Sequence, residues 1–260
     1  MSFNIRMNYQ DDGPNNWEHR IDWIEDMVNH YNPGILGAQE CYFPQFQDME
    51  SRLNEYEAFG PVEGRQGAES VALFYKKDRY MLLDSGTFWL SATPDRQSLG
   101  WDANLRRTVT WGSFRDRNSD KPLFAFVTHF DHKGNTARRE SIRLLKAKVQ
   151  EIAGTSPAVI MGDFNLRPDS EYYSQLTTAA DGLPAFYDAK KAAAHYYGPQ
   201  WTVNALGAVP AEKRAHIDYI FTNSKMKVHE YINIAEQRGD VFLSDHNPQY
   251  AVIQLSHESP

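Results

Sequence analysis

The chain has 260 residues, of which 41% are hydrophobic and 23% are charged. This composition is typical of a globular protein with a sizeable core and excludes an intrinsically disordered chain. The formal net charge of −7 does not favour nucleic acid as a partner, since a phosphate backbone is normally matched by an excess of Lys and Arg.

Cys41 is the only cysteine, which excludes an internal disulfide and a metal site built from several cysteines. No run approaches the roughly 18 apolar residues of a membrane span, and the start of the chain shows no signal peptide. We therefore expect a cytoplasmic protein without a membrane span. Because the first predicted strand begins at Ser2, a secretion leader removed before it stays open as the alternative.

The first third of the chain predicts a strand, a helix and a second strand. The strand is expected at Ser2–Arg6. The helix is indicated by apolar residues at helical spacing, Trp17, Ile21, Ile24 and Val28. It has Asn16 as a possible cap and ends before Pro33. The short apolar segment Ile35–Gln39 then predicts a buried strand with Glu40 at its end.

The middle of the chain predicts antiparallel strands from runs of β-branched and aromatic residues, at Val71–Tyr75, Met81–Leu90, Arg107–Phe114 and Leu123–Phe130. A helix is expected from Thr136 to Ala153, stopping at Gly154, with a strand at Ala158–Met161. A further helix, Glu171–Thr178, and two more strands, His216–Thr222 and Gln249–Leu255, complete the series.

No repeat, low-complexity tract or linker divides these elements, so we expect one domain spanning residues 1–260. Strands dominate and helices flank them. The predicted fold is an α+β, four-layer α/β/β/α sandwich, in which two mainly antiparallel sheets pack face to face with helices outside.

Polar residues collect where the predicted strands end, a position at which a rigid scaffold can hold catalytic groups. The segments are Phe3-Asn4-Ile5, Gln39-Glu40, Thr128–His132, Gly162–Asn165, His216–Tyr219 and Ser244–Pro248. They supply carboxylates, amides and histidines but no thiol, a set that suits Mg²⁺, with Mn²⁺ as a substitute. Such groups could neutralise phosphate oxygens, deprotonate a water and stabilise a leaving oxygen.

In this order, S-F-N, Q-E, T-H-x-D-H, G-D-F-N, I-D-Y and S-D-H resemble the endonuclease/exonuclease/phosphatase superfamily. That superfamily contains pancreatic deoxyribonuclease, abasic-site endonucleases, sphingomyelinases, inositol polyphosphate 5-phosphatases and nocturnin-type enzymes. The resemblance spans Asn4 to His246, nearly the whole chain. For the metal it implies Glu40 as the principal Mg²⁺ ligand, Asn4 in the metal shell or on a phosphate oxygen, and Asp245 assisting the metal or a histidine.

The resemblance also implies roles in the chemistry. Asp163 would orient or deprotonate the attacking water, and Asn165 would bind a phosphate oxygen through its amide. His246 would act as general base or transition-state donor, held in its tautomer by Asp218. His129 would contact the scissile phosphate or protonate the leaving group.

Two departures bear on the substrate. Arg6 stands where abasic-site endonucleases carry an acidic residue, and His129 replaces their tyrosine, so specificity for abasic DNA loses support. The segments Gly86–Pro94 and Gly100–Asp102 resemble markers of a bacterial branch that comes without a known substrate. Several arginines are candidates for binding substrate phosphate, and the sequence favours none of them: Arg6, Arg106, Arg107, Arg138, Arg139 and Arg167.

Alone, Asp163 and Asn165 could form an Asx turn and His129 could be a core histidine; the ordered set favours a site. The expected function is Mg²⁺-dependent hydrolysis of a small or lipid-derived phosphoester, with a nuclease as the alternative. A binuclear zinc site at His129–His132 is disfavoured, because Val127 replaces the histidine such a site requires. A non-catalytic ligand-binding protein is disfavoured, because the expected positions carry competent side chains.

Overall fold

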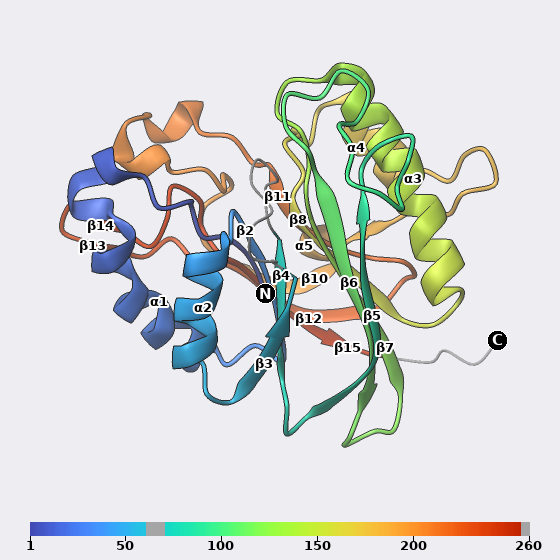
Figure 1. The fold of residues 1–260 in the computed structure, drawn as a ribbon, viewed down its shortest axis with the longest axis horizontal. Helices are drawn as coiled ribbons and strands as arrows, with labels where there is room; N and C mark the ends of the chain where they lie inside the picture. Colours follow the sequence, from blue (N-terminus) through green and yellow to red (C-terminus); the bar gives the residue numbers. More distant parts are fainter. Residues whose placement is uncertain (61–70, 256–260) are drawn as a thin grey trace.

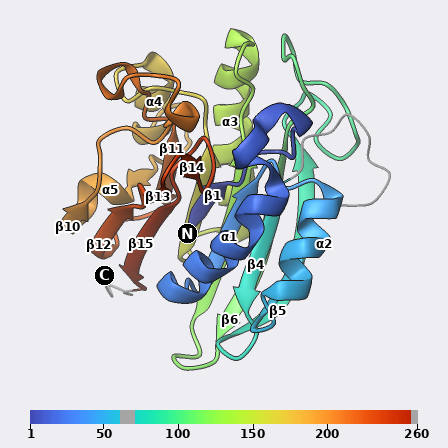
Figure 2. The same ribbon diagram turned by 90° about the vertical axis from the view of Figure 1, so that its left-hand side faces the viewer.

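The computed structural model describes residues 1–60 and 71–255. In this part of the chain two large sheets pack face to face, with α1 (Trp17–Tyr31) and α2 (Phe43–Arg52) outside one and α3 (Asn135–Ala153) and α4 (Glu171–Thr177) outside the other (Figure 1). Seen from the α1 side, these first two helices lie across the outer face of their sheet (Figure 2). The predicted four-layer sandwich is confirmed.

The first sheet has the order β10 (Ala193–Tyr197), β12 (Lys227–Asn233), β15 (Gln249–Gln254), β1 (Ser2–Asn4), β2 (Ile35–Gln39), β4 (Ala72–Lys76) and β3 (Tyr56–Phe59). The second has the order β5 (Tyr80–Trp89), β6 (Thr108–Asp116), β7 (Pro122–His129), β8 (Ala158–Asp163), β11 (Asp218–Thr222) and β9 (Tyr187–Asp188). The pairs β1–β2, β10–β12 and β7–β8 are parallel, and the other described pairs in these sheets are antiparallel.

Smaller elements connect the layers. A hairpin is formed by β13 (Gln237–Arg238) and β14 (Val241–Phe242), and α5 (Ala189–Ala192) precedes β10. The short 3₁₀ helices are η1 (Gln10–Asn15), η2 (Ala205–Gly207) and η3 (Ala211–Lys213). Among the described helices, none combines the length and the apolar character required to cross a bilayer.

The inner strands are apolar throughout because both of their faces are buried. In β4, Leu73 and Tyr75 pack between the two sheets, whereas Phe74 packs under α1 and α2. In β7, Val127 lies between the sheets and Phe126 faces the layer of α3 and α4. Since successive side chains point to opposite faces of a strand, a continuous apolar run is what a sheet covered on both sides requires.

Several observed elements were not predicted: helices α2 and α5, the three described 3₁₀ helices, and strands β3, β9, β10, β12, β13 and β14. Two of them show how weak the local pattern can be. Helix α2 buries Gln45, Phe46 and Met49 in an otherwise polar sequence. Strand β12 loses its apolar alternation because a β-bulge shifts its register between Val228 and Glu230. Predicted element ends differ by a few residues from the observed ones.

The strand pairing brings the polar motifs to one end of the sandwich. Asn4 at the end of β1 is in register with Gln39, the residue before Glu40, and His129 at the end of β7 is in register with Asp163 at the end of β8. Parallel neighbours end at the same edge of a sheet, so these pairs follow directly from the topology. The antiparallel strand β11 adds Asp218 opposite Asp163.

A fully buried arginine, Arg20 of α1, joins the two ends of the chain. Its guanidinium donates to the carbonyl oxygens of Asn15 at 2.6 Å, Ile5 at 2.8 Å, Leu243 at 2.6 Å and Arg6 at 3.3 Å. Burial lowers the pKa of Arg20 to about 10, which leaves the group charged at neutral pH. The backbone next to Asn4 is thereby held against the backbone that leads to Asp245 and His246.

We expect the substitution Arg20→Met to lower the free energy of unfolding by about 3–5 kcal/mol, because it leaves buried carbonyl groups without a donor. Urea unfolding followed by circular dichroism measures this change. The matched control is Arg143→Met, whose side chain is 58% exposed and should change stability by less than about 0.5 kcal/mol. Equal losses in the two variants would contradict the role given to Arg20.

Candidate active site

A pocket lies at the end of the sandwich where β1, β2, β7 and β8 end. Five of the residues predicted for the site line it: Glu40, His129, Asp163, Asn165 and His246. The remainder of its lining comes from Met7, Tyr9, Tyr42, Leu105, Arg107 and His132, which were not predicted for catalysis or metal binding. The other three predicted residues do not line this pocket. Asn4 contacts Glu40, Asp218 contacts His246, and Asp245 contacts Arg6. The polar motifs therefore meet at one end of the sandwich.

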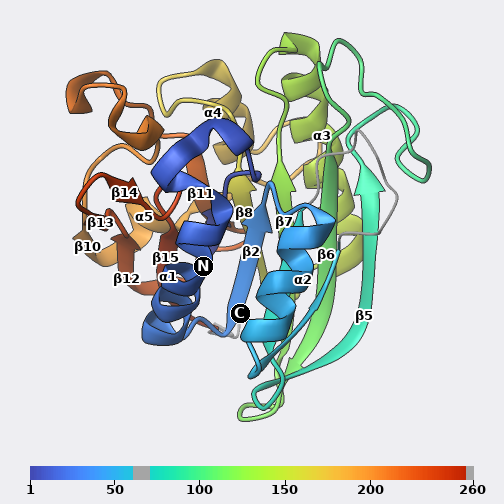
Figure 3. The same ribbon diagram turned by 60° about the vertical axis from the view of Figure 1, so that its left-hand side comes forward.

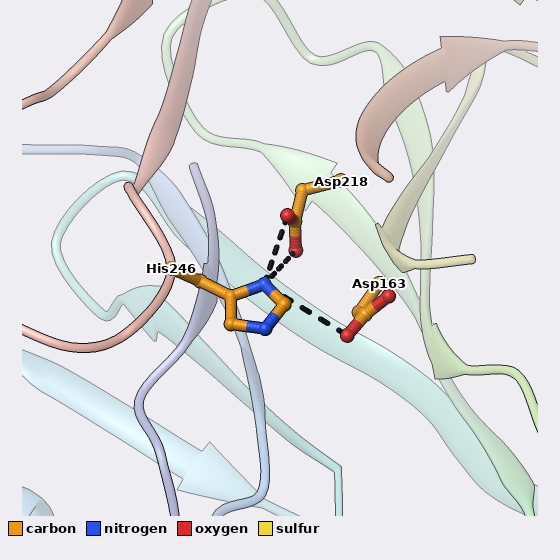
Figure 4. Close-up of side chains that lie close together, drawn as sticks. All are labelled: Asp163, Asp218 and His246. Atoms are coloured by element: carbon orange, nitrogen blue, oxygen red, sulfur yellow. Dashed lines mark hydrogen bonds and ion pairs between the residues drawn. The ribbon is translucent and has the colours of Figure 1, made fainter. Parts of the chain in front are cut away.

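His246 and Asp218 form a buried hydrogen-bonded pair (Figure 4). His246 Nδ1 lies 2.9 Å and 3.1 Å from the two Asp218 carboxylate oxygens, and the Thr202 hydroxyl donates to the same carboxylate. Because Nδ1 is engaged, Nε2 is the ring nitrogen left for the pocket. Burial by itself would lower the pKa of His246, but the carboxylates of Asp218, Asp245 and Asp163 raise it well above its ordinary value.

Asp163 is the carboxylate that the surrounding groups share. Its Oδ2 atom lies 3.2 Å from His129 Nε2, 3.2 Å from Asn4 Nδ2 and 3.9 Å from His246 Nδ1, and its Oδ1 accepts from the Asn165 backbone N–H at 3.0 Å. The Asx turn considered as an alternative is thus real and belongs to the site. Burial and the nearby Asp218 carboxylate raise the pKa of Asp163 to about 7.

His129 and Asn165 meet at the other side of Asp163. The Asn165 amide donates to the Phe130 carbonyl at 3.0 Å and lies 3.0 Å from His129 Nε2. Burial and the Arg107 cation lower the pKa of His129 well below its ordinary value, so this ring is neutral. Its tautomer decides whether Nε2 accepts from Asn165 or donates to Asp163.

Glu40, the residue after β2, presents its carboxylate to the pocket. The residue has a left-handed backbone, φ 55°, and its oxygens accept from Asn4 Nδ2 at 3.1 Å and from the Met7 backbone N–H at 2.8 Å. A carboxylate has about four lone-pair sites, so both oxygens keep capacity for a cation. Asn4 directs its N–H groups at Glu40 and Asp163, because its oxygen accepts from the Arg6 N–H at 3.0 Å. Direct ligation by Asn4 would require its amide to rotate.

Asp245 is paired with Arg6. The Arg6 guanidinium lies 2.5 Å from an Asp245 oxygen, and its remaining N–H groups contact Asp12, while Ser244 Oγ lies 3.2 Å from the second Asp245 oxygen. These contacts occupy the carboxylate, which does not line the pocket described above. Asp245 contributes to the raised pKa of His246, whereas its contacts with Arg6 and Ser244 give no support to Asp245 as a metal ligand.

Asp163, Asp218 and His246 offer ligand atoms within 4.8 Å of one another, close enough to hold one cation. A cation at that point would displace the hydrogen bonds between His246 and Asp218. Glu40 faces the pocket without that cost, and its oxygens are the donor type that a hard divalent cation prefers. The donor set therefore fits a divalent metal at the Glu40 end.

The binuclear zinc alternative does not fit. Both Asp131 carboxylate oxygens accept hydrogen bonds from backbone N–H groups, those of Asn104, Leu105, Lys133 and Gly134. His132 Nδ1 lies 3.4 Å from the Arg107 guanidinium. Among the candidate arginines, Arg107 lines the pocket, Arg6 is bound by two carboxylates, and Arg139 pairs with an exposed glutamate.

The model of the Endonuclease/Exonuclease/phosphatase family matches residues 1–246. The structure of the endonuclease/exonuclease/phosphatase from Bacteroides vulgatus is similar, with 40% identity and a TM-score of 0.93 over 98% of this chain and 97% of that one. The mannosyl-6-phosphatase of Bacteroides thetaiotaomicron is 29% identical, with a TM-score of 0.85, over 97% of this chain and 98% of that one.

Curated relatives are more distant. Human nocturnin is 26% identical over 79% of this chain and 48% of its own length, so the chain spans about half of that relative. The uncharacterized protein L388 of Acanthamoeba polyphaga mimivirus is 28% identical over 57% of this chain and 59% of its own length.

The raised pKa of Asp163 predicts a pH-dependent stability difference in protein treated with EDTA. A folded-state pKa of about 7 means that the folded protein keeps a proton that the unfolded chain releases above its ordinary pKa of 3.8. Wild-type stability should therefore fall, relative to Asp163→Asn, as the pH rises through this window.

Urea unfolding at about pH 5 and about pH 7.5 should show the variant gaining about 1–3 kcal/mol relative to wild type at the higher pH. Asp169→Asn, with a side chain that is 80% exposed, is the control and should show no such change. If Asp163→Asn and wild type differ in free energy of unfolding by the same amount at both pH values, the pKa of the Asp163 carboxyl is not raised.

Proposed function

The chain belongs to the endonuclease/exonuclease/phosphatase family, and we propose that it hydrolyses a small phosphoester with the help of Mg²⁺. Members of this family are hydrolases that act on phosphoesters. The observation that carries the proposal is the meeting of Asp163, Asn165, His129 and His246 around one pocket with Glu40 at its edge. A non-catalytic protein has no need of such a set of buried, mutually bonded polar groups.

The environments of Asp163 and His246 favour different steps of the proposed hydrolysis. Asp163, with a pKa of about 7, is matched to take the proton from an attacking water near neutral pH. His246, kept protonated by Asp218, would donate from Nε2 to a phosphate oxygen and stabilise charge in the transition state. This protonation favours the transition-state donor over the general base as the role of His246.

One N–H of the Asn165 amide donates to the Phe130 carbonyl, and the other would hold a phosphate oxygen when His129 Nε2 donates to Asp163. Glu40 would hold the cation, with Asn4 behind it. When bound there, a divalent cation would neutralise negative charge on the phosphate and polarise the phosphorus centre.

The substrate is proposed to be a small phosphomonoester. Support comes from the mannosyl-6-phosphatase of Bacteroides thetaiotaomicron, which resembles this chain over almost its whole length. The net charge of −7 favours a small substrate over a long polyanion. Nuclease activity is the alternative outcome of the substrate panel below.

The variants His246→Ala and Asp163→Ala should lower kcat by about 10²–10⁴-fold, because each removes a group that acts in the transition state. With Mg²⁺ present, phosphate release would be measured on mannose 6-phosphate and p-nitrophenyl phosphate, and cleavage of the ester bond on a phosphodiester and a single-stranded oligonucleotide. His229→Ala, an exposed histidine on β12, is the matched control. Cleavage of the oligonucleotide alone would replace the phosphatase with a nuclease, and unchanged turnover in both variants would overturn the mechanism.

The variant Glu40→Gln should raise the Mg²⁺ concentration for half-maximal activity by about tenfold or more, since it removes charge from the proposed ligand. Paramagnetic resonance of Mn²⁺ gives the same affinity without substrate. EDTA should abolish activity in wild type, and Mg²⁺ or Mn²⁺ should restore it. Glu50→Gln, at an exposed position on α2, is the control. Equal Mn²⁺ affinity in wild type and Glu40→Gln would remove Glu40 as the ligand.

A further inference from the structure

The pocket has two sides that are built differently. His129 and Asp163 stand at strand ends and are held by sheet register. Leu105 and Arg107 come instead from the segment between β5 and β6, residues 90–107. Figure 3 shows this connection above the upper end of β5, next to the start of α3.

Asp131 ties the β5–β6 segment to the chain after β7. One of its oxygens accepts from the backbone N–H groups of Asn104 at 2.9 Å and Leu105 at 3.1 Å. The other accepts from those of Lys133 at 2.9 Å and Gly134 at 2.7 Å. The residue is 2% exposed, and such charge-assisted bonds compensate the burial of a carboxylate. A single side chain therefore fixes the backbone of Leu105 relative to the neighbouring His132.

Asp102 provides a second tie between the same two regions. Its carboxylate accepts from the backbone N–H groups of Thr136 at 3.1 Å and Ala137 at 2.6 Å, in the first turn of α3. The local cap residue, Gly134, has no side chain to do this, so the β5–β6 segment caps the helix from a distance. A Cβ atom on Gly134 would lie 2.7 Å from the Asp102 carbonyl oxygen, so the close approach requires glycine.

We propose that Asp131 is a positioning residue that holds the β5–β6 segment in place to select the alcohol part of the substrate. The inference rests on the proposed phosphatase function. With the phosphate at Asp163 and His246, the group attached to it meets Leu105 and the tyrosines Tyr9 and Tyr42. Aromatic and aliphatic side chains of this kind pack against the C–H face of a ring. The preferred substrate class is therefore a phosphomonoester of a compact ring alcohol.

The experiment compares kcat and KM for a ring substrate, mannose 6-phosphate, with those for an open-chain one, glycerol 3-phosphate. In Asp131→Ala the KM for the ring substrate should rise about tenfold with a smaller change in kcat, and the preference for the ring should fall by a similar factor. Asp116→Ala is the matched control. Asp116 is also buried and accepts backbone N–H groups of Asn118 and Ser119, but in the turn after β6.

A double-mutant cycle separates positioning from general destabilisation. Leu105→Ala should lower the ring preference in the wild-type background and change little in the Asp131→Ala background, because the segment is already displaced. Gly134→Ala should mimic Asp131→Ala. Equal loss of ring preference in Asp116→Ala and Asp131→Ala, or full additivity with Leu105→Ala, would overturn the inference.

Hydrogen exchange provides a readout that does not depend on turnover. The amides of Asn104 and Leu105 should exchange faster in Asp131→Ala, and mannose 6-phosphate should protect them in wild type. If wild type hydrolyses no phosphoester, the proposed function fails, and the exchange measurement separately tests whether Asp131 holds the segment and whether mannose 6-phosphate binds against it. Unchanged exchange in Asp131→Ala, or no protection by mannose 6-phosphate in wild type, would refute the inference.

Discussion

The buried guanidinium of Arg20 is the contact on which the site depends. It bonds carbonyl groups at Ile5 and Arg6 and the one at Leu243, so a single cation fixes the backbone beside the first and the last motif. Sheet pairing also joins the two ends of the chain, since β1 lies between β15 and β2. Residues separated by almost the length of the chain share one pocket because their backbones are joined directly behind it.

The electrostatics of the site follow from burying several charged groups within a few ångströms. Asp163 and Asp218 repel each other in a region that excludes water, and this raises the pKa of Asp163. The nearby carboxylates raise the pKa of His246, so this histidine stays protonated. The environment thus gives the two groups opposite charge behaviour, which in the proposed mechanism separates a base from a cationic donor. Burying these groups has a cost in stability that their bonded partners reduce.

The division of the pocket into two sides has a physical consequence. His129 and Asp163, at the ends of β7 and β8, are held in register by the pairing of these two strands. The β5–β6 segment is held to the chain after β7 by the carboxylates of Asp102 and Asp131 rather than by strand pairing. Binding residues commonly stand on loops that a rigid scaffold positions in this way.

The sequence by itself determined the long helices, most of the strands and the six polar motifs, because each is a short pattern whose physical meaning is local. It could not show that Thr202 bonds Asp218, that Arg6 engages Asp245, or that Asp131 organises a segment rather than zinc. Arg6 and Asp245 are 239 positions apart, and no local pattern encodes such a pair. Only the tertiary structure decides which polar residues meet, since burial and backbone direction select the partners.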